Sequence, residues 1–215
     1  MSDINLRITE IFYSLQGEAR TVGFPTVFIR LTGCPLRCQY CDTDYAFSGG
    51  EWMNLDAILT QVKQYNTSFV TVTGGEPLAQ PNCVHLLNTL CDEKYDVSLE
   101  TSGAISLKEV DARTKKVMDI KTPASNECDK NLWENLQWIN DRDQIKFVIC
   151  DERDYLWCKQ KIDEFDLQSK CEILFSPCDG QLSPTQLADW ILHDQLPVRF
   201  QLQLHKVLWG NQPGK

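Results

Sequence analysis

Seven short apolar runs, rich in β-branched residues, are spaced along the chain with helix-like segments between them. The runs cover residues 25–31, 69–73, 96–100, 116–120, 144–149, 172–176 and 198–204. Strand and helix patterns that alternate in this way predict an α/β fold built on a parallel sheet. Such a sheet forms either a doubly wound open structure or an incomplete barrel, and the periodicity is compatible with both.

The segments between these runs carry apolar residues at helical spacing. Leu55, Ile58, Leu59 and Val62 line one face of the first predicted helix, and Asn54 precedes them as an N-cap residue. Further helices are expected near residues 84–90, 132–139, 155–165 and 183–191, with a short one at 106–113. The helix at 183–191 begins with a Ser-Pro pair, a capping residue followed by proline at the first helical position.

The size and charge of the chain restrict its class. It has 215 residues, and we expect residues 1–215 to form one domain. The formal net charge of −9 disfavours non-specific binding to nucleic acids or anionic membranes, whose phosphates would repel the protein. No apolar run approaches the roughly 20 residues of a membrane span, and residues 1–10 lack the apolar core of a signal peptide. Ten cysteines without a secretion signal predict a cytoplasmic protein that uses some of them for metal.

Three of these cysteines, Cys34, Cys38 and Cys41, lie in one short segment with the spacing C-x3-C-x2-C. Three neighbouring thiolates can hold three irons of a [4Fe–4S] cluster, which normally takes four cysteines, and would leave the fourth iron open to another ligand. A zinc site normally takes four protein ligands, and the three histidines, at positions 85, 193 and 205, lie far away in the sequence. A disulfide with one spare thiol is a less favoured alternative. The other seven cysteines have no metal-site spacing and are expected to be free thiols.

Polar and glycine-rich motifs follow several of the predicted strands. They are Thr73-Gly74-Gly75-Glu76-Pro77, Glu100-Thr101-Ser102-Gly103, Asp119-Ile120-Lys121-Thr122-Pro123 and Ser176-Pro177, and the cysteine segment follows the first strand. Because the active sites of parallel α/β proteins gather at the C-terminal ends of the strands, these motifs predict a single shared site.

The cysteine motif, with Tyr40 directly before its last cysteine, resembles that of the radical S-adenosylmethionine (SAM) superfamily, and Gly74-Gly75-Glu76 resembles its GGE motif. The resemblance implies an incomplete TIM-like barrel of parallel strands with outer helices. It also implies a [4Fe–4S] cluster whose open iron binds SAM, and a SAM-derived radical that abstracts a substrate hydrogen. The GGE motif would hold the SAM amino group, since glycines allow close approach and a carboxylate suits an ammonium. Without the cysteines, the same motif would equally be a tight turn after a strand.

A narrower resemblance covers nearly the whole chain. The stretches Leu15-Gln16-Gly17-Glu18, Cys41-Asp42-Thr43, Glu100-Thr101-Ser102-Gly103 and His205-Lys206 resemble the 7-carboxy-7-deazaguanine synthase family of queuosine biosynthesis. This resemblance implies that 6-carboxy-5,6,7,8-tetrahydropterin loses a hydrogen from C6, contracts its ring and releases ammonia. It implies no catalytic residue beyond the cluster and SAM.

The same resemblance implies roles for individual residues. Substrate contacts would come from Leu15, Gln16, Gly17, Glu18, Arg30, Thr73 and His205. SAM contacts would come from Tyr40, Gly74, Gly75, Glu76, Ser102, Lys121, Thr122, Pro123, Ser176 and Pro177. Thr43 would bind Mg²⁺ together with the substrate carboxylate, since both offer the hard oxygen ligands that this ion prefers. A homodimer and an electron donor such as flavodoxin are further implications.

Several of these residues also have simpler explanations. Arg30, inside an apolar strand, is placed to form a buried ion pair, for example with Glu100, and Thr43 is placed to stabilise a turn. His205 fits a structural role, and Glu76 fits an acidic position at a helix N-terminus.

The resemblance has departures and competitors. Ala19 stands where the family usually has glycine, and Ser102 where it often has asparagine. Alternative functions are a glycyl-radical-enzyme activase, which shares the cysteine motif, and an iron–sulfur electron carrier. Residues 15–18 and 42–43, which carry the narrower resemblance, disfavour the activase. An electron carrier would normally have a fourth clustered cysteine.

Overall fold

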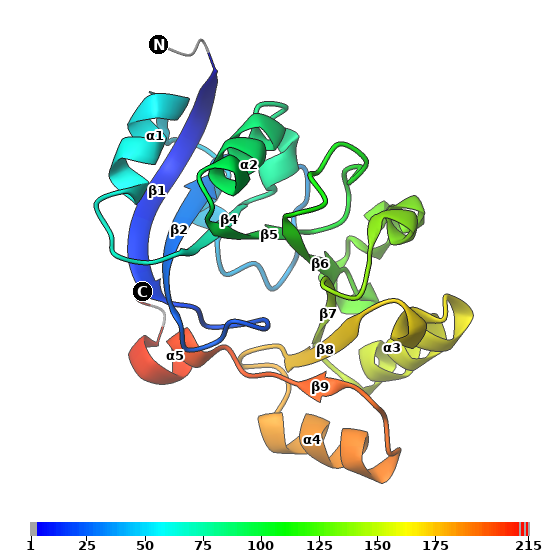
Figure 1. The fold of residues 1–215 in the computed structure, drawn as a ribbon. Coiled ribbons are helices and arrows are strands. Elements are labelled where there is room, and N and C mark those ends of the chain that lie inside the picture. Colours follow the sequence, from blue (N-terminus) through cyan, green and yellow to red (C-terminus); the bar gives the residue numbers. More distant parts are fainter. Residues whose placement is uncertain (1–3, 211, 213, 215) are drawn as a thin grey trace.

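The computed structural model describes residues 4–210, 212 and 214, and its centre is a nine-stranded sheet (Figure 1). The strands are β1 (Asn5–Leu15), β2 (Pro25–Leu31), β3 (Glu51–Asn54), β4 (Phe69–Gly74), β5 (Asp96–Thr101), β6 (Lys115–Ile120), β7 (Gln144–Ile149), β8 (Glu172–Pro177) and β9 (Arg199–Phe200). Their order in the sheet is β3-β1-β2-β4-β5-β6-β7-β8-β9. Neighbouring strands from β2 to β9 pair in parallel, and β1 is antiparallel to both β2 and β3. Within the described residues the outer strands β3 and β9 do not pair with each other, so the sheet is the predicted partial barrel.

Six of the seven predicted strands match β2, β4, β5, β6, β7 and β8 to within one residue at either end. The strand predicted at 198–204 is wrong in extent, because only the two residues of β9 pair as a strand and a helix begins at Leu204. The sequence pattern also missed β1 and β3. Most residues of these two strands are partly exposed, so their apolar residues do not form the buried runs that mark the central strands.

The α-helices are α1 (Leu55–Val62), α2 (Cys83–Asp92), α3 (Glu152–Glu164), α4 (Pro184–His193) and α5 (Leu204–Trp209). Helices α1 to α4 lie on the outside of the curved sheet (Figure 1). The predicted cap of α1 is confirmed, because Asn54 Oδ1 accepts a hydrogen bond from the Ala57 N–H at 2.8 Å. None of the helices in the described ranges is long and apolar enough to cross a membrane.

Two predicted helices are wrong. The segment near 132–139 forms a 3₁₀-helix, Trp133–Trp138, instead of an α-helix. Residues 106–113 form turns, because the side chains of Ser106 and Asp111 accept hydrogen bonds from the backbone N–H groups of Lys108 and Arg113. Such local side-chain bonds compete with a helical backbone.

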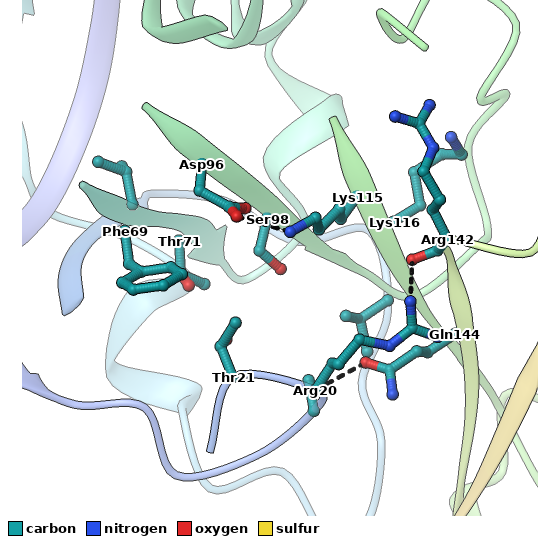
Figure 2. Close-up of a pocket in the computed structure, with 13 residues that line it drawn as sticks. Arg20, Thr21, Phe69, Thr71, Asp96, Ser98, Lys115, Lys116, Arg142 and Gln144 are labelled. Atoms are coloured by element: carbon teal, nitrogen blue, oxygen red, sulfur yellow. Dashed lines mark hydrogen bonds and ion pairs between the residues drawn. The ribbon is translucent and has the colours of Figure 1, made fainter. Parts of the chain in front are cut away.

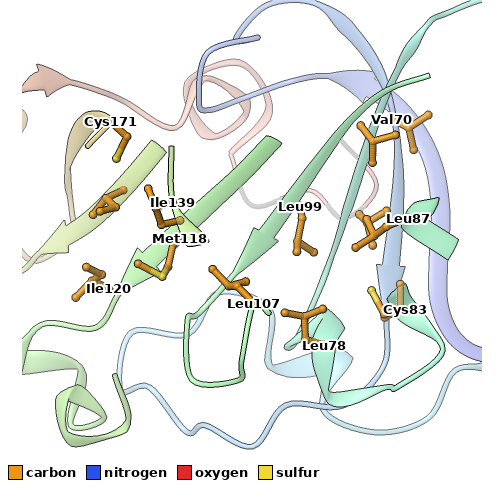
Figure 3. Packing of buried hydrophobic residues seen from close by; sticks show 14 of the residues in the cluster. Val70, Leu78, Cys83, Leu87, Leu99, Leu107, Met118, Ile120, Ile139 and Cys171 are labelled. Atoms are coloured by element: carbon orange, nitrogen blue, oxygen red, sulfur yellow. The ribbon is translucent and has the colours of Figure 1, made fainter. Parts of the chain in front are cut away.

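Alternation along the strands separates an apolar outer face from a polar inner face. On the outer face, Val70 of β4, Leu99 of β5 and Met118 of β6 belong to one buried cluster that includes Leu87 of α2 (Figure 3). The alternate positions on the same strands carry polar residues that line a pocket, among them Thr73, Glu100 and Asp119. The barrel interior is therefore polar, while its outside holds the hydrophobic core.

The loop between β1 and β2, residues 16–24, crosses the N-terminal ends of the parallel strands. Gln16 Nε2 donates to Thr71 Oγ1 of β4 at 3.0 Å, and the Arg20 N–H donates to Gln144 Oε1 of β7 at 2.9 Å. Figure 2 shows Arg20 and Thr21 beside the first residues of β5 and β6. The loop closes this end of the barrel and brings residues 16–18 into the interior from the N-terminal ends of the parallel strands.

Candidate active site

One pocket of about 670 Å³ opens at the C-terminal ends of the strands. Its walls come from the cysteine segment, the ends of β4 to β7, the β1–β2 loop and α5. The predicted site residues that line it are Leu15, Gln16, Gly17, Glu18, Arg30, Cys34, Cys38, Tyr40, Cys41, Thr43, Thr73, Gly74, Gly75, Ser102, Lys121 and His205. The structure thus brings together residues that are separated by most of the chain, as a single shared site requires.

The three clustered cysteines are partly buried free thiols that face this pocket. Burial raises the pKa of each thiol, and that of Cys38 to about 11, while the positive charge of Lys121 opposes the increase. No group of three His, Cys, Asp or Glu side chains in the described part of the chain is arranged around a single metal ion. A cubane cluster does not need such an arrangement, because each cysteine binds a different iron.

The turn after β4 approaches the cysteine segment closely. A Cβ on Gly75 would lie 2.4 Å from the Gly33 carbonyl oxygen and 2.7 Å from Cys34 Cβ. A Cβ on Gly74 would lie 2.3 Å from the Leu31 carbonyl oxygen. Only glycine therefore fits at these two positions, and its small size lets the turn pack directly against the cysteine segment.

Glu76 lies behind the pocket wall and is fully buried. Its carboxylate accepts hydrogen bonds from Thr101 Oγ1, from Ser102 Oγ and N–H, and from the Leu78 N–H, at 2.5–3.1 Å. It also caps the short 3₁₀-helix Pro77–Ala79. In this conformation Glu76 binds the turn after β5, and its predicted contact with SAM stays a prediction.

Four further predicted SAM contacts do not line the pocket: Thr122, Pro123, Ser176 and Pro177. Thr122 is fully buried, and its hydroxyl donates to the Val148 carbonyl at 3.1 Å and to Asp154 Oδ2 at 3.0 Å. Ser176 is also buried, whereas Cys178, two residues later, lines the pocket.

Arg30 is held at the pocket wall by an acid and two aromatic rings. Its Nε donates to Glu10 Oε1 at 2.7 Å, and its guanidinium carbon lies 5.7 Å from the ring centres of Phe12 and Tyr45. The ion-pair partner is therefore Glu10 on the neighbouring strand β1, and not Glu100. This arrangement orients a cation toward the pocket beside two aromatic faces.

The floor of the pocket carries four charged side chains of alternating sign, which we call the charge row: Glu18, Lys146, Asp119 and Lys121. Lys146 Nζ lies 2.5 Å from Glu18 Oε2 and 3.5 Å from Asp119 Oδ2, and Lys121 Nζ lies 3.2 Å from Asp119 Oδ2. Asp119 Oδ1 is buried and has no hydrogen-bond partner among the described residues. The row extends from the predicted substrate segment to the cysteines, and the open acceptor on Asp119 fits a polar ligand.

The first turn of α5 forms the opposite wall. Gln203 Nε2 donates to Glu18 Oε1 at 2.6 Å, and Lys206 Nζ lies 3.0 Å from Asp42 Oδ2. Burial lowers the pKa of His205, so the imidazole favours its neutral form. Thr43 donates to Asp42 Oδ1 at 2.9 Å, which places hydroxyl and carboxylate oxygens together at the pocket edge.

No site role was predicted for Lys146, Gln203 and Cys178, which line the pocket, and Glu100 and Asp119 were included only as the first residues of two predicted site motifs. Lys146 sits within a predicted strand, between the apolar residues Ile145 and Phe147. Charged residues at such positions cannot belong to an apolar face, so the period-two pattern would have placed them inside the barrel. Gln203 carried no such signal, because its segment was predicted to be a strand.

Comparison with known proteins agrees with this geometry. Residues 28–119 match the model of the radical SAM superfamily. A 7-carboxy-7-deazaguanine synthase from Chlorobaculum tepidum is 45% identical over 208 residues, which are 95% of this chain and 94% of that protein. A protein of the same name from Koribacter versatilis is 40% identical over 219 residues, covering 95% and 97% of the two chains. The crystal structure of QueE from Escherichia coli shares the fold, with a TM-score of 0.78, 23% identity and coverage of 94% and 95%.

Proposed function

Because the chain belongs to the 7-carboxy-7-deazaguanine synthase family of radical SAM enzymes, we propose that it converts 6-carboxy-5,6,7,8-tetrahydropterin to 7-carboxy-7-deazaguanine with loss of ammonia. The observation that carries this proposal is that one pocket holds all three clustered cysteines together with Gln16, Glu18 and Arg30. The relatives named above give no support to an activase or an electron carrier.

Membership of the radical SAM superfamily implies a [4Fe–4S] cluster and SAM. When bound, they supply the one-electron chemistry that removes a hydrogen atom from the substrate. Cys34, Cys38 and Cys41 would hold the cluster. Gly74 and Gly75 let the turn after β4 pack directly against the cysteine segment, and Lys121 favours the thiolate form that iron requires.

The rest of the pocket would bind the substrate and hold it in place. Arg30 and Lys206 offer positive charge to a substrate carboxylate in an otherwise acidic protein. Gln16 and Thr73 offer polar atoms on the inner face, and the rings of Phe12 and Phe28 offer an apolar surface to a flat heterocycle.

Thr43 and the substrate carboxylate would bind Mg²⁺ at the pocket edge, with the Asp42 carboxylate beside them. We expect Thr43→Ala to weaken the stimulation of product formation by Mg²⁺ about tenfold without abolishing SAM cleavage. Product formation and SAM cleavage are measured over a Mg²⁺ titration. If both activities fall together, or neither changes, Thr43 does not bind the ion.

Several broader proposals follow from the family. The enzyme would act as a homodimer in the cytoplasm and would receive electrons from a donor such as flavodoxin. The ten free cysteines fit a reducing compartment.

The proposed function is tested with anaerobically reconstituted protein, SAM, a chemical reductant and the tetrahydropterin. We expect the wild-type protein to bind about four irons, the content of one cubane cluster, and to form the deazaguanine. Cys38→Ala should lose cluster iron and all product while the protein stays folded. Cys171→Ala, which changes a buried cysteine directly before β8, is the matched control and should keep both. Turnover by Cys38→Ala would exclude the radical mechanism.

A further inference from the structure

Lys146 is a buried lysine that no sequence motif indicated, yet it lies at the centre of the pocket floor. It is the third residue of β7, and only 8% of its surface is exposed. Its ammonium contacts Glu18 at 2.5 Å and lies 3.5 Å from Asp119. A buried ammonium is costly unless it is paired, and this one is paired with carboxylates from two separate elements.

Several strands and α5 place titratable side chains around Glu18. The titratable groups around it are Lys146 from β7, Glu100 from β5, Asp119 from β6 beyond the lysine, and His205 from α5. Burial raises the pKa of Glu18, but the charge of Lys146 and the hydrogen bonds from Lys146 and Gln203 outweigh burial and lower it. Burial and the negative charge of Glu18 raise the pKa of Glu100. The two neighbouring carboxyl groups are thus driven in opposite directions, Glu18 toward the carboxylate and Glu100 toward the acid.

We propose that Lys146 is a positioning residue that orients Glu18 and keeps it negatively charged, so that Glu18 accepts hydrogen bonds from two adjacent N–H groups of the substrate ring. This inference rests on the proposed function, because the aminopyrimidinone edge of a pterin presents an amino group and a ring N–H side by side. A carboxylate has about four acceptor positions, and Glu18 uses three of them, for Lys146, Gln203 and, at 3.4 Å, Gln201. It can bind both groups while it keeps Lys146 and Gln203 if the long hydrogen bond from Gln201 gives way. A neutral carboxylic acid would instead turn its own O–H toward one of the donors.

Lys146 acts through Glu18, so its removal should change affinity and protonation and leave the chemical step nearly intact. In Lys146→Met, Glu18 would lie buried beside Glu100 and Asp119 without its cation, and it would take up a proton. We expect the KM for the tetrahydropterin to rise about tenfold, because the substrate loses one charge-assisted hydrogen bond. The kcat should stay within about threefold of wild type. In the pH profile of kcat/KM, the acidic limb should shift to higher pH by about one unit.

A second measurement follows the proton without turnover. Substrate is titrated into the reconstituted enzyme with SAM and without reductant, in two buffers of different ionisation enthalpy. Wild-type enzyme should release no proton from Glu18 on binding, whereas Lys146→Met should release about one more near pH 7, because Glu18 must ionise to bind. Lys146→Arg keeps the charge and should restore the acidic limb.

The chain offers a matched control at the opposite end of the neighbouring strand. Lys116, in β6, is also buried and forms an ion pair with Asp143 at 3.0 Å, but it does not line the active-site pocket. Lys116→Met should lower stability as any broken buried ion pair does, while KM, the pH profile and proton release stay as in wild type. If both lysine variants change KM and the pH profile alike, the effect is general destabilisation and the inference is wrong.

A double variant keeps the test decisive if Lys146→Met does not fold. Glu18→Gln/Lys146→Met removes both buried charges together, and its substrate affinity should equal that of Glu18→Gln alone. A further loss in the double variant would show that Lys146 does not act through Glu18. Failure of the wild-type enzyme to bind or convert the tetrahydropterin would overturn the proposed function. Normal wild-type turnover with an unchanged Lys146→Met profile would overturn only the role of Lys146.

Discussion

Gly17 is a position in the pocket that has no room for a side chain, because the imidazole of His205 occupies the space where that side chain would lie. A Cβ on Gly17 would come within 2.1 Å of His205 Nδ1. The Leu204 N–H also donates to the Gly17 carbonyl at 2.9 Å, so the β1–β2 loop and α5 are joined at this point. The glycine in the Gln-Gly-Glu stretch is therefore explained by a contact with the far end of the chain.

We expect Gly17→Ala to push the His205 ring and the first turn of α5 away from the pocket. The KM for the tetrahydropterin should rise about tenfold, and the free energy of unfolding should fall by about 2 kcal/mol, a usual cost of overpacking. Steady-state kinetics and urea unfolding measure the two effects. In a His205→Ala background the clash is absent, so the same substitution should cost little there. An equal cost in both backgrounds would contradict the proposed clash.

Residues differ in how far the sequence could predict their roles. Ala19 was singled out because the family usually has glycine there, and it does adopt a left-handed backbone with φ of 61°. The bond from its N–H to Gln201 Oε1 was not predictable, because no local pattern connects residues 182 positions apart. The period-two pattern would have placed Lys146 inside the barrel, but its pairing with Glu18, 128 positions away, was not predictable for the same reason. Motifs identify residues near the cysteines, whereas long-range charge pairs require the fold.

At the scale of the element, the rule that active sites gather at the C-terminal ends of parallel strands holds for most of this pocket. The cysteine segment and the turns after β4, β5 and β6 all meet there. The β1–β2 loop is the exception, because β1 is antiparallel and its loop enters from the opposite end. The rule therefore predicted most of the site, but it could not place residues 15–18, which precede the first predicted strand.

The residues that precede α1 and α4 differ in how they cap their helices, and this difference predicts different contributions to stability. Asn54 caps α1 through a side-chain hydrogen bond to the Ala57 N–H, whereas Ser183 precedes α4 without such a bond. Asn54→Ala should lower the free energy of unfolding by about 1 kcal/mol, because a backbone donor loses its partner. Ser183→Ala is the matched control and should cost clearly less. Equal losses in urea unfolding would mean that the Asn54 side chain contributes nothing specific.

At the scale of the whole molecule, individual hydrogen bonds and not a strand ladder connect the two ends of the chain across the open barrel. Gln201 and Gln203 contact Ala19 and Glu18, and the Leu204 N–H bonds to Gly17. The central parallel strands were predictable because their buried runs are local signals. The closure was not predictable, because single polar contacts between distant segments leave no periodic pattern.

This closure should depend on pH through His205. Burial lowers the pKa of the docked imidazole below its usual value of 6.5, so an undocked imidazole binds its proton at higher pH. Docking of α5 should therefore be fully favourable above pH 6.5 and weaken as the pH falls below it. Hydrogen exchange of residues 204–209, corrected for intrinsic rates, should show less protection at pH 5.5 than at pH 8. His205→Gln should lose this dependence, and a change at the exposed His85 should leave it intact.

The C-terminal segment has a practical consequence for anyone who handles the protein. Gly210, Gln212 and Gly214 line the same pocket as the cysteines, whereas the start of β1 lies far from α5 (Figure 1). Because these residues line the pocket, we expect an affinity tag fused at the C-terminus to obstruct reconstitution and assays. A tag placed ahead of Met1 should leave the entrance free, and it is the safer choice for purification.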